Sequence, residues 1–176
     1  GAAWFTKLVP RGDTTYAVRS ALRNGTDGLR ATMQVVSGRP GAWSAPTTLS
    51  TDPIASYTEA FADATGRLHA VWRGYSTSTS AMRASTLERG ASAWAGEQVI
   101  RSASDLELAV DNGFDAIPDG DGNAVAAWMT RSRTIQLTRY DGVAPTFGVV
   151  TIPGTGFVQQ GLAFTAAASD AGPRAT

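Results

Sequence analysis

The sequence contains no cysteine and a single histidine, His69, among its 176 residues. The absence of cysteine excludes disulfides, thiolate metal sites and cysteine catalysis. With one histidine, a zinc site built from several histidines is also excluded, and a Ser-His-Asp triad has only one candidate base. Charge of one sign is not in surplus either, because 15 Lys and Arg residues balance 15 Asp and Glu residues. We therefore expect no nucleic-acid partner.

No apolar run approaches the roughly 20 residues that a helix needs to cross a bilayer, so no membrane span is expected. No signal peptide is visible, which indicates a cytosolic chain, a processed one or an excised fragment. The lack of cysteine suits a bacterial exported protein without demonstrating export. Apolar residues make up 43% and charged residues 17% of the chain, a composition that predicts a folded core rather than disorder.

Two pairs of residues mark an internal repeat. Gly66 and Gly122 have the same separation in the sequence as Trp72 and Trp128, and each glycine lies in a turn that precedes a short run ending in the tryptophan. The stretch 12–19, GDTTYAVR, also aligns with GRLHAVWR, which matches glycine with glycine and arginine with arginine at the two ends. We interpret the two glycines and the two tryptophans as structural residues of the repeat, each indole pinning one unit to its neighbour.

A second marker recurs at a similar period. Trp43 lies in GAWSAPTTLS and Trp94 in SAWAGEQVIR, with a weaker third copy in APTFGVVTIP at 144–153. Both tryptophans follow turns rich in Gly and Ser, and an indole face can stack on a sugar ring. Trp43 and Trp94 are therefore the candidate ligand-binding residues, with blade-to-blade packing as the structural alternative.

The units consist of short strands. RLHAVW places Leu68, Ala70 and Trp72 on one face, whereas NAVAAWM is apolar on both faces like a buried inner strand. Clusters of Gly, Asn, Asp and Ser separate such runs. A unit of about 50–56 residues with about four strands is typical of a β-propeller blade. We predict an all-β fold of about three antiparallel four-stranded blades, forming a partial or oligomer-completed β-propeller, because rings usually need four to eight blades.

A family resemblance follows from the same stretches. The pattern W-S-A-P-x-x-L-S at 43–50, followed by D-x-x-G-x-x-x-A-V-W at 63–72, resembles secreted bacterial β-propeller-like repeat proteins that often carry PKD-type domains. The resemblance implies a secreted or cell-surface protein. A weaker similarity, in DGDGNAVAAW and SDAGPRAT, relates the chain to the Asp-boxes of sialidase-type propellers. The tryptophan content is similar to that of small lectin propellers.

The domain boundaries follow from the repeat and the resemblance. Residues 1–11 are interpreted as a leading segment and 12–157 as the propeller-like repeats. Residues 158–176 fit either the last blade strand or the start of a PKD-type β-sandwich, and the blade is favoured.

An acid-rich turn offers a candidate Ca²⁺ site. Asp119, Asp121 and Asn123 alternate in DGDGN, a spacing of oxygen ligands that opens an EF-hand-like loop. The remainder departs from that loop, since Ala124 replaces the required Gly and Thr130 stands where a bidentate Glu is needed. A hairpin turn without metal is the favoured interpretation, so no cofactor is expected.

These observations favour binding over catalysis. We expect a non-catalytic extracellular binding or adhesion module whose partner is a glycan or a protein, because repeated blades form a rigid frame for variable loops. One alternative is a fragment of a sialidase-like propeller glycoside hydrolase, for which Arg19, Arg73 and Arg131 lie near the ends of equivalent strands. A second alternative is a structural spacer or filament subunit. Open blade edges also predict a homo-oligomer.

Overall fold

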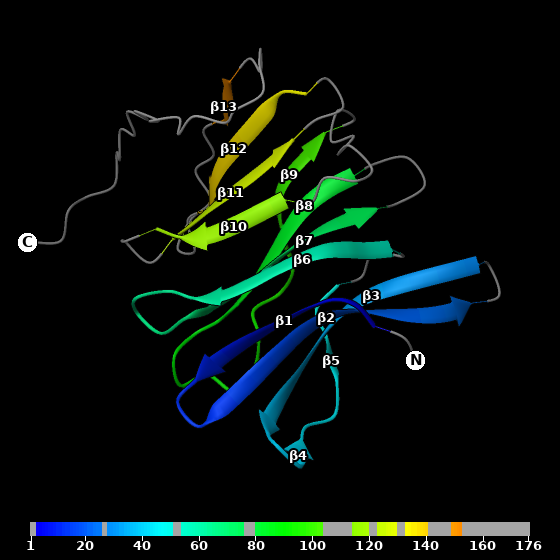
Figure 1. Ribbon diagram of the computed structural model, residues 1–176, viewed down its shortest axis with the longest axis vertical. Coiled ribbons are helices and arrows are strands. Elements are labelled where there is room, and N and C mark those ends of the chain that lie inside the picture. Colours follow the sequence, from blue (N-terminus) through cyan, green and yellow to red (C-terminus); the bar gives the residue numbers. More distant parts are fainter. Residues whose placement is uncertain are drawn as a thin grey trace, which may run out of the picture.

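The protein is an all-β structure. The computed structural model describes residues 3–25, 28–50, 54–75, 80–103, 114–119, 123–129, 133–140 and 149–152. These residues form strands and their connections, with no helix among them (Figure 1). The predicted fold class is thereby confirmed as far as an all-β, antiparallel chain.

The strands follow one another as three antiparallel meanders. The first consists of β1 (Ala3–Arg11), β2 (Thr14–Gly25) and β3 (Gly28–Arg39), with the short β4 (Ala42–Trp43) and β5 (Thr47–Thr48) both paired to β3. The second consists of β6 (Ile54–Ala62), β7 (Leu68–Tyr75), β8 (Ser80–Leu87) and β9 (Gln98–Ala103). The third consists of β10 (Phe114–Pro118), β11 (Ala124–Met129), β12 (Ile135–Tyr140) and β13 (Val149–Ile152).

The meanders are distinct units although the first two share one sheet. Among the described residues, a single parallel bridge between Ala31 and Ile54 joins their ladders, while the third meander forms a four-stranded sheet of its own. Over the residues that the structure describes, neither sheet closes on itself. Residues 3–11, which belong to the stretch interpreted as a leading segment, form β1 and pair with β2 along its length. Residues 158–176 lie outside the described part of the chain.

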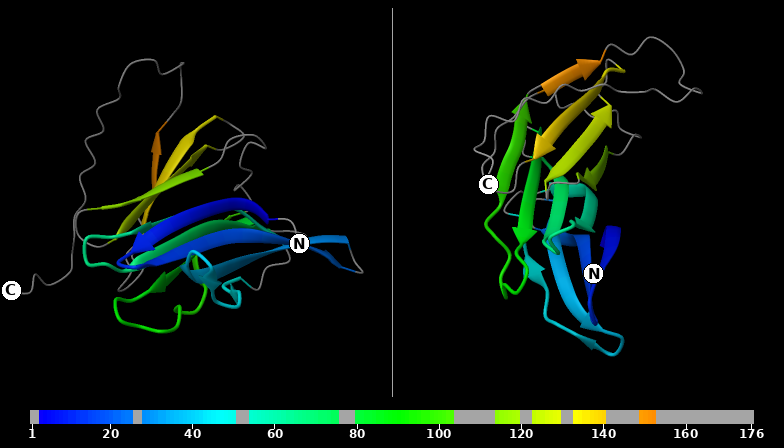
Figure 2. Two further views of the ribbon diagram at one scale, coloured as in Figure 1. Left: turned by 60° about the horizontal axis from the view of Figure 1, so that its bottom comes forward. Right: turned by 90° about the vertical axis from the view of Figure 1, so that its left-hand side faces the viewer.

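Successive meanders pack face to face, as the views in Figure 2 show. The face of a meander that covers the preceding one is called here its leading face, and the opposite face its trailing face. In the second meander Leu68, Ala70 and Trp72 lie on the leading face and join the core shared with the first meander. Val71 and Met82 lie on its trailing face and join the core shared with the third. Alternation along β7 thus buries both sides of one strand.

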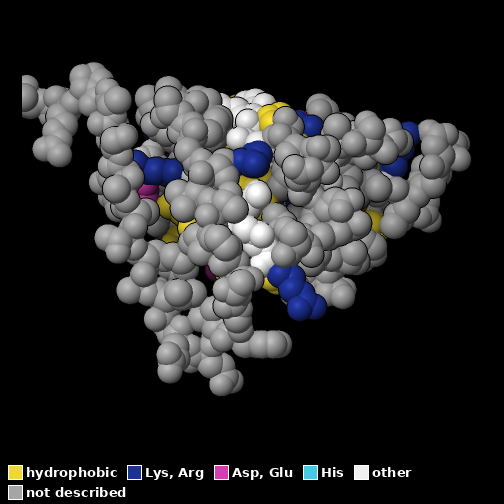
Figure 3. Space-filling model, turned by 90° about the horizontal axis from the view of Figure 1, so that it is seen from above, with side chains coloured by type: hydrophobic (Ala, Val, Ile, Leu, Met, Phe, Trp, Pro, Cys, Tyr) yellow, Lys and Arg dark blue, Asp and Glu magenta, His cyan; other side chains and the backbone are white. Residues whose placement is uncertain are grey.

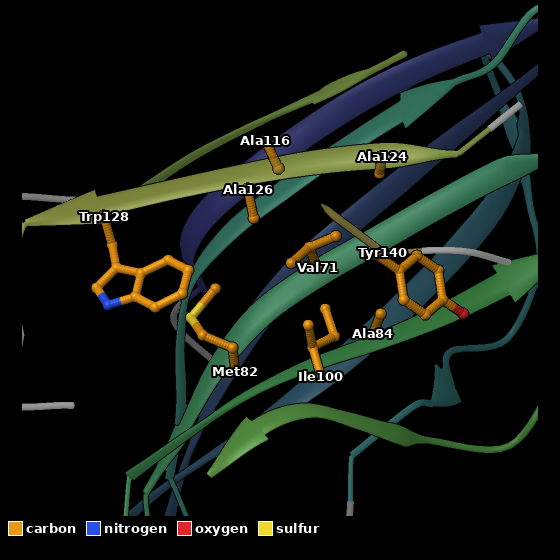
Figure 4. Packing of buried hydrophobic residues seen from close by; sticks show 9 residues of the cluster. All are labelled: Val71, Met82, Ala84, Ile100, Ala116, Ala124, Ala126, Trp128 and Tyr140. Carbon is orange, nitrogen blue, oxygen red and sulfur yellow. The ribbon is translucent and has the colours of Figure 1, made fainter. Parts of the chain in front are cut away.

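The core between the second and third meanders is built from small and large side chains that interdigitate. Trp128 points from β11 towards Met82, and Tyr140 lies beside Ala84 (Figure 4). The alanines of the third meander, Ala116, Ala124 and Ala126, are buried here. Short side chains on one sheet leave room for the indole and the phenol between two sheets.

Strand register corrects the sequence alignment of the first repeat. Val18 pairs with Val35 and lies on the trailing face, as does Val71 with its partner Ala84. Val18 is therefore the counterpart of Val71, and not of Trp72 as the alignment predicted. A shift of one residue moves every side chain of a strand to the other face.

A difference between two turns explains the shift. Four residues separate Pro10 from its partner Thr15, whereas five separate Ala62 from Leu68. The β1–β2 turn is consequently one residue shorter than the β6–β7 turn. An alignment that matches Gly12 with Gly66 therefore shifts β2 by one residue relative to β7.

Candidate functional site

The hairpin that carries Trp43 is held tightly against β3. Trp43 pairs with Gly38, and a Cβ atom at Gly38 would lie 2.1 Å from the carbonyl oxygen of Ala42, so only glycine allows this approach. The Ser44 N–H donates to the Ser37 carbonyl (2.8 Å), and the Ser37 N–H donates to the Ser44 hydroxyl (3.0 Å). These contacts fix the backbone on either side of the indole.

Trp43 is one of the most exposed large apolar residues in the described part of the chain, with 47% of its surface accessible. Its partner Gly38 places it on the leading face of the first meander. Arg39 pairs with Ala42 and donates to the carboxylate of Asp13 at 3.0 Å, with both side chains well exposed. Alternation along β3 sets Arg39 on the face opposite to Gly38 and Trp43, so the open indole is the feature of this hairpin that suits stacking on a ligand.

Trp94 occupies the corresponding place in the second meander but has a different environment. It is half-buried against the core clusters between the first and second meanders. The Ala95 N–H donates to the Thr86 carbonyl (2.7 Å), as the Ser44 N–H does to Ser37 in the first meander. Trp94 therefore covers part of the interface between the first and second meanders. Of the two ligand-binding residues that the sequence predicted, only Trp43 is widely accessible.

Trp72 and Trp128 lie in equivalent surroundings. Each comes from the second strand of its meander and fills the core shared with the preceding meander, at 0% and 2% exposure. Neither indole N–H has a hydrogen-bond partner within the part of the chain that the structure describes. Gly66 adopts a positive φ of 82° in the β6–β7 turn, whereas Gly122 lies outside the described residues.

The aspartates of two equivalent turns make the same contacts. The Asp63 N–H donates to the Arg67 carbonyl (2.9 Å), and the Arg67 N–H donates back to Oδ1 of Asp63 (3.0 Å). In the third meander, the Asp119 N–H donates to the Asn123 carbonyl (2.9 Å), and the Asn123 N–H donates to Oδ1 of Asp119 (2.9 Å). Each carboxylate thus caps the turn that connects the first two strands of its meander.

The Ca²⁺ candidate coincides with the second of these turns. Oδ2 of Asp119 accepts a hydrogen bond from Nε of Arg139 at 2.7 Å, so both carboxylate oxygens already bind protein donors. Asn123 lies across the turn, and Asp121 is outside the described residues. Over those ranges no three His, Cys, Asp or Glu side chains gather as a metal site would require.

The pair formed by Asp63 and His69 is a feature that sequence reasoning missed. Nε2 of His69 lies 2.8 Å from Oδ2 of Asp63, and both side chains are fully buried. The histidine ring stacks on Phe61 (centroids 5.1 Å apart) and meets Tyr140 edge-on (6.2 Å). The signal available in the sequence was the short separation of the two residues across a turn, which places both at one end of a hairpin.

Burial and hydrogen bonding act in opposite directions on the pKa of each member of this pair. It lowers the pKa of His69 below 6.5, although the hydrogen bond and charge of Asp63 act in the opposite direction. Burial raises the pKa of Asp63, but hydrogen bonds from His69, Thr65 and the Arg67 N–H outweigh it and lower the pKa below 3.8. A neutral imidazole beside a carboxylate is chemically capable of base catalysis, but no substrate can reach a ring that is completely enclosed.

The arginines considered for a hydrolase do not form a cluster in the described residues. Arg73 is buried on the trailing face of the second meander and donates to the Ser80 hydroxyl at 3.3 Å. Arg19 is half-buried on the leading face of the first meander, and Arg131 lies outside the described ranges. The widely exposed Trp43 hairpin is therefore the better candidate for a functional site.

Comparison with protein-family models and with curated proteins finds no match to this chain. Within the described ranges, no helix has the length and apolar character needed to cross a membrane.

Proposed function

We propose that the protein is a non-catalytic binding module, secreted or displayed at a cell surface, that recognises a glycan through Trp43. The observation that carries this proposal is an indole, 47% exposed, on a hairpin whose backbone is fixed on both sides. A preorganised aromatic ring stacks on the apolar face of a sugar with little loss of conformational entropy.

We also propose that the three meanders are blades of a partial or oligomer-completed β-propeller. Three observations support this architecture: the strands of each meander follow in chain order, the sheets pack face to face, and Trp72 and Trp128 occupy the same place in successive seams. Blades of this kind form a rigid frame on which recognition residues are carried at the edges.

A protein surface is the second candidate ligand, and the position of Trp94 favours it. Trp94 corresponds to Trp43 and packs against the core between the first two meanders of the same chain. A sheet presented by another protein could cover Trp43 in the same manner. Glycan binding and protein binding are separated by the experiment that follows.

The experiment is a titration with a panel of soluble oligosaccharides, monitored by tryptophan fluorescence. We expect at least one sugar to change the emission of the wild-type chain and Trp43→Ala to abolish that change. Val99→Ala serves as the matched control, because Val99 is similarly exposed (46%) but lies on the edge strand β9. A response that survives in Trp43→Ala contradicts the site, and the absence of any response contradicts glycan binding.

Two further measurements test the rest of the proposal. Hydrolysis of fluorogenic glycosides by the wild-type chain would overturn the non-catalytic assignment in favour of the sialidase-like alternative. We propose that no cofactor is needed, because Arg139 and the Asn123 N–H already engage the carboxylate of Asp119. Removal of Ca²⁺ with a chelator should therefore leave the melting temperature unchanged, and a drop of several degrees would refute this.

A further inference from the structure

The first and last meanders each have one face that no other meander covers among the described residues. The leading faces of the second and third meanders are buried on the trailing faces of their predecessors. By the same register, the leading face of the first meander and the trailing face of the third are the two surfaces left over. Both carry exposed apolar residues, which a solvated sheet face normally avoids.

The leading face of the first meander is apolar along one cross-strand row. Leu8 pairs with Ala17, which in turn pairs with Val36, so the three residues lie on the same face of β1, β2 and β3. Leu8, at the β1 end of this row, is 65% exposed. Trp43 extends the same face at its edge.

The trailing face of the third meander carries apolar residues on β10 and β11. Ile117, which is 58% exposed, pairs with Val125 on this face, and Val125 pairs with Arg139. The neighbouring row runs from Asp115 through Ala127 to Leu137. Figure 3, the view from above, shows scattered hydrophobic side chains and Lys or Arg side chains among the described residues.

The two faces also match in charge. Arg19 is the counterpart of Trp72, because each follows one of the equivalent valines Val18 and Val71. The Nε atom of Arg19 has no hydrogen-bond partner among the described residues. Trp72 shares a core with Val18 and Val35, which belong to the cross-strand row Lys7–Val18–Val35 of the preceding meander. The matching row of the third meander holds Asp115, a carboxylate suited to the guanidinium of Arg19.

We propose that these two faces bind each other in separate copies of the chain, so that the trailing face of one third meander covers the leading face of the next copy's first meander. This contact between copies repeats the interface that the chain already forms between its first and second meanders and between its second and third. It is heterologous, because two different surfaces meet, and it generates a ring if the rotation closes and a filament if it does not. The contact places Trp43 where Trp94 lies in the interface between the first two meanders, so a glycan reaches Trp43 only on a leading face that no other copy covers.

The test is the molar mass in solution, measured by light scattering and sedimentation over a range of concentrations. We expect the mass of the wild-type chain to rise with concentration to at least twice that of one chain. Leu8→Glu blocks one face and Ile117→Glu the other, so each variant alone should be monomeric. An equimolar mixture of the two variants retains one good contact and should give a particle with one copy of each, twice the mass of a single chain and no larger.

Val99→Glu is the matched control, because it places the same charge at a similarly exposed apolar residue outside both faces. It should associate as the wild type does, and far-UV circular dichroism checks that every variant is folded. A wild-type chain that is monomeric at all concentrations overturns the proposal, and so does a monomeric mixture. If only one of the two face variants prevents association, like faces meet and the head-to-tail arrangement is wrong.

Other occupants of these faces give different results. If the chain becomes oligomeric only when residues 153–176 are removed, that segment covers a face and the proposal fails. Loss of the fluorescence response in Trp43→Ala reports on the glycan site, whereas the mass of the Leu8→Glu and Ile117→Glu variants reports on assembly. Failure of either proposal is therefore recognised separately.

Discussion

Replacement of Trp72 by alanine tests whether buried indoles hold successive meanders together. The side chain is 0% exposed and fills the core between the first two meanders. Truncation of a buried Trp to Ala typically costs about 3–5 kcal/mol, the sum of lost burial and the cavity left behind. The indole N–H has no partner among the described residues, and its removal returns part of a desolvation penalty of about 1–3 kcal/mol. We therefore expect a loss near the lower limit of that range, about 3 kcal/mol.

The assay is urea unfolding monitored by far-UV circular dichroism, which does not depend on tryptophan emission. A domain is stable by only about 5–15 kcal/mol, so Trp72→Phe is measured in parallel as a milder change. The phenylalanine removes the same N–H, keeps most of the volume, and should cost less than about 2 kcal/mol. Trp128→Ala should resemble Trp72→Ala, because the two indoles occupy equivalent seams.

Trp43→Ala is the control for removal of an indole that is not enclosed, and it should change stability by less than about 1 kcal/mol. Equal losses for Trp72→Ala and Trp43→Ala would refute the reasoning, since burial would then not decide the outcome. A large difference between Trp72→Ala and Trp128→Ala would refute the equivalence of the two seams.

Three further predictions follow from the buried pair and from the hairpins. Resistance to urea should decrease as the pH falls below 6.5, because burial lowers the pKa of His69 and unfolding then takes up a proton; His69→Gln should flatten this part of the pH profile. Asp63→Ala should lower the free energy of unfolding by about 3–5 kcal/mol, measured with urea, because it leaves a buried imidazole and the N–H donors of the turn unpaired. Asp119→Ala, in the more accessible equivalent turn, should lower it by about 1 kcal/mol. Gly38→Ala should lower the melting temperature by several degrees, since its Cβ would lie 2.1 Å from the carbonyl oxygen of Ala42; an unchanged melting temperature would show that β4 moves aside freely.

Local sequence patterns predicted strands in each unit, but not β1, which lies in the stretch interpreted as a leading segment. The alternation of RLHAVW and the turn residues around it predict β7 and its neighbours, because side chains on a strand point to opposite faces with a period of two. The recurrence of Trp72 and Trp128 after similar turns indicated equivalent positions, and both indoles are buried in equivalent seams.

Register and exposure were decided only by the tertiary structure. A matching glycine and arginine favoured the alignment of Val18 with Trp72, but one fewer residue in the β1–β2 turn makes Val18 the counterpart of Val71. Sequence treated Trp43 and Trp94 alike because their local surroundings are similar. Their exposure differs because it depends on whether another sheet lies against them, which no local pattern records.

The burial of the Asp63–His69 pair was likewise decided by the tertiary structure. Alternation placed His69 on the face opposite Trp72, and the structure agrees, but the enclosure of the ring comes from Phe61 and from Tyr140 of the next meander. The sequence by itself determined the alternation within strands such as β7 and the period of the units, because these depend on neighbours along the chain. Which residues are buried, paired or left open to a ligand was decided by contacts between meanders, because those join residues that are far apart in the chain.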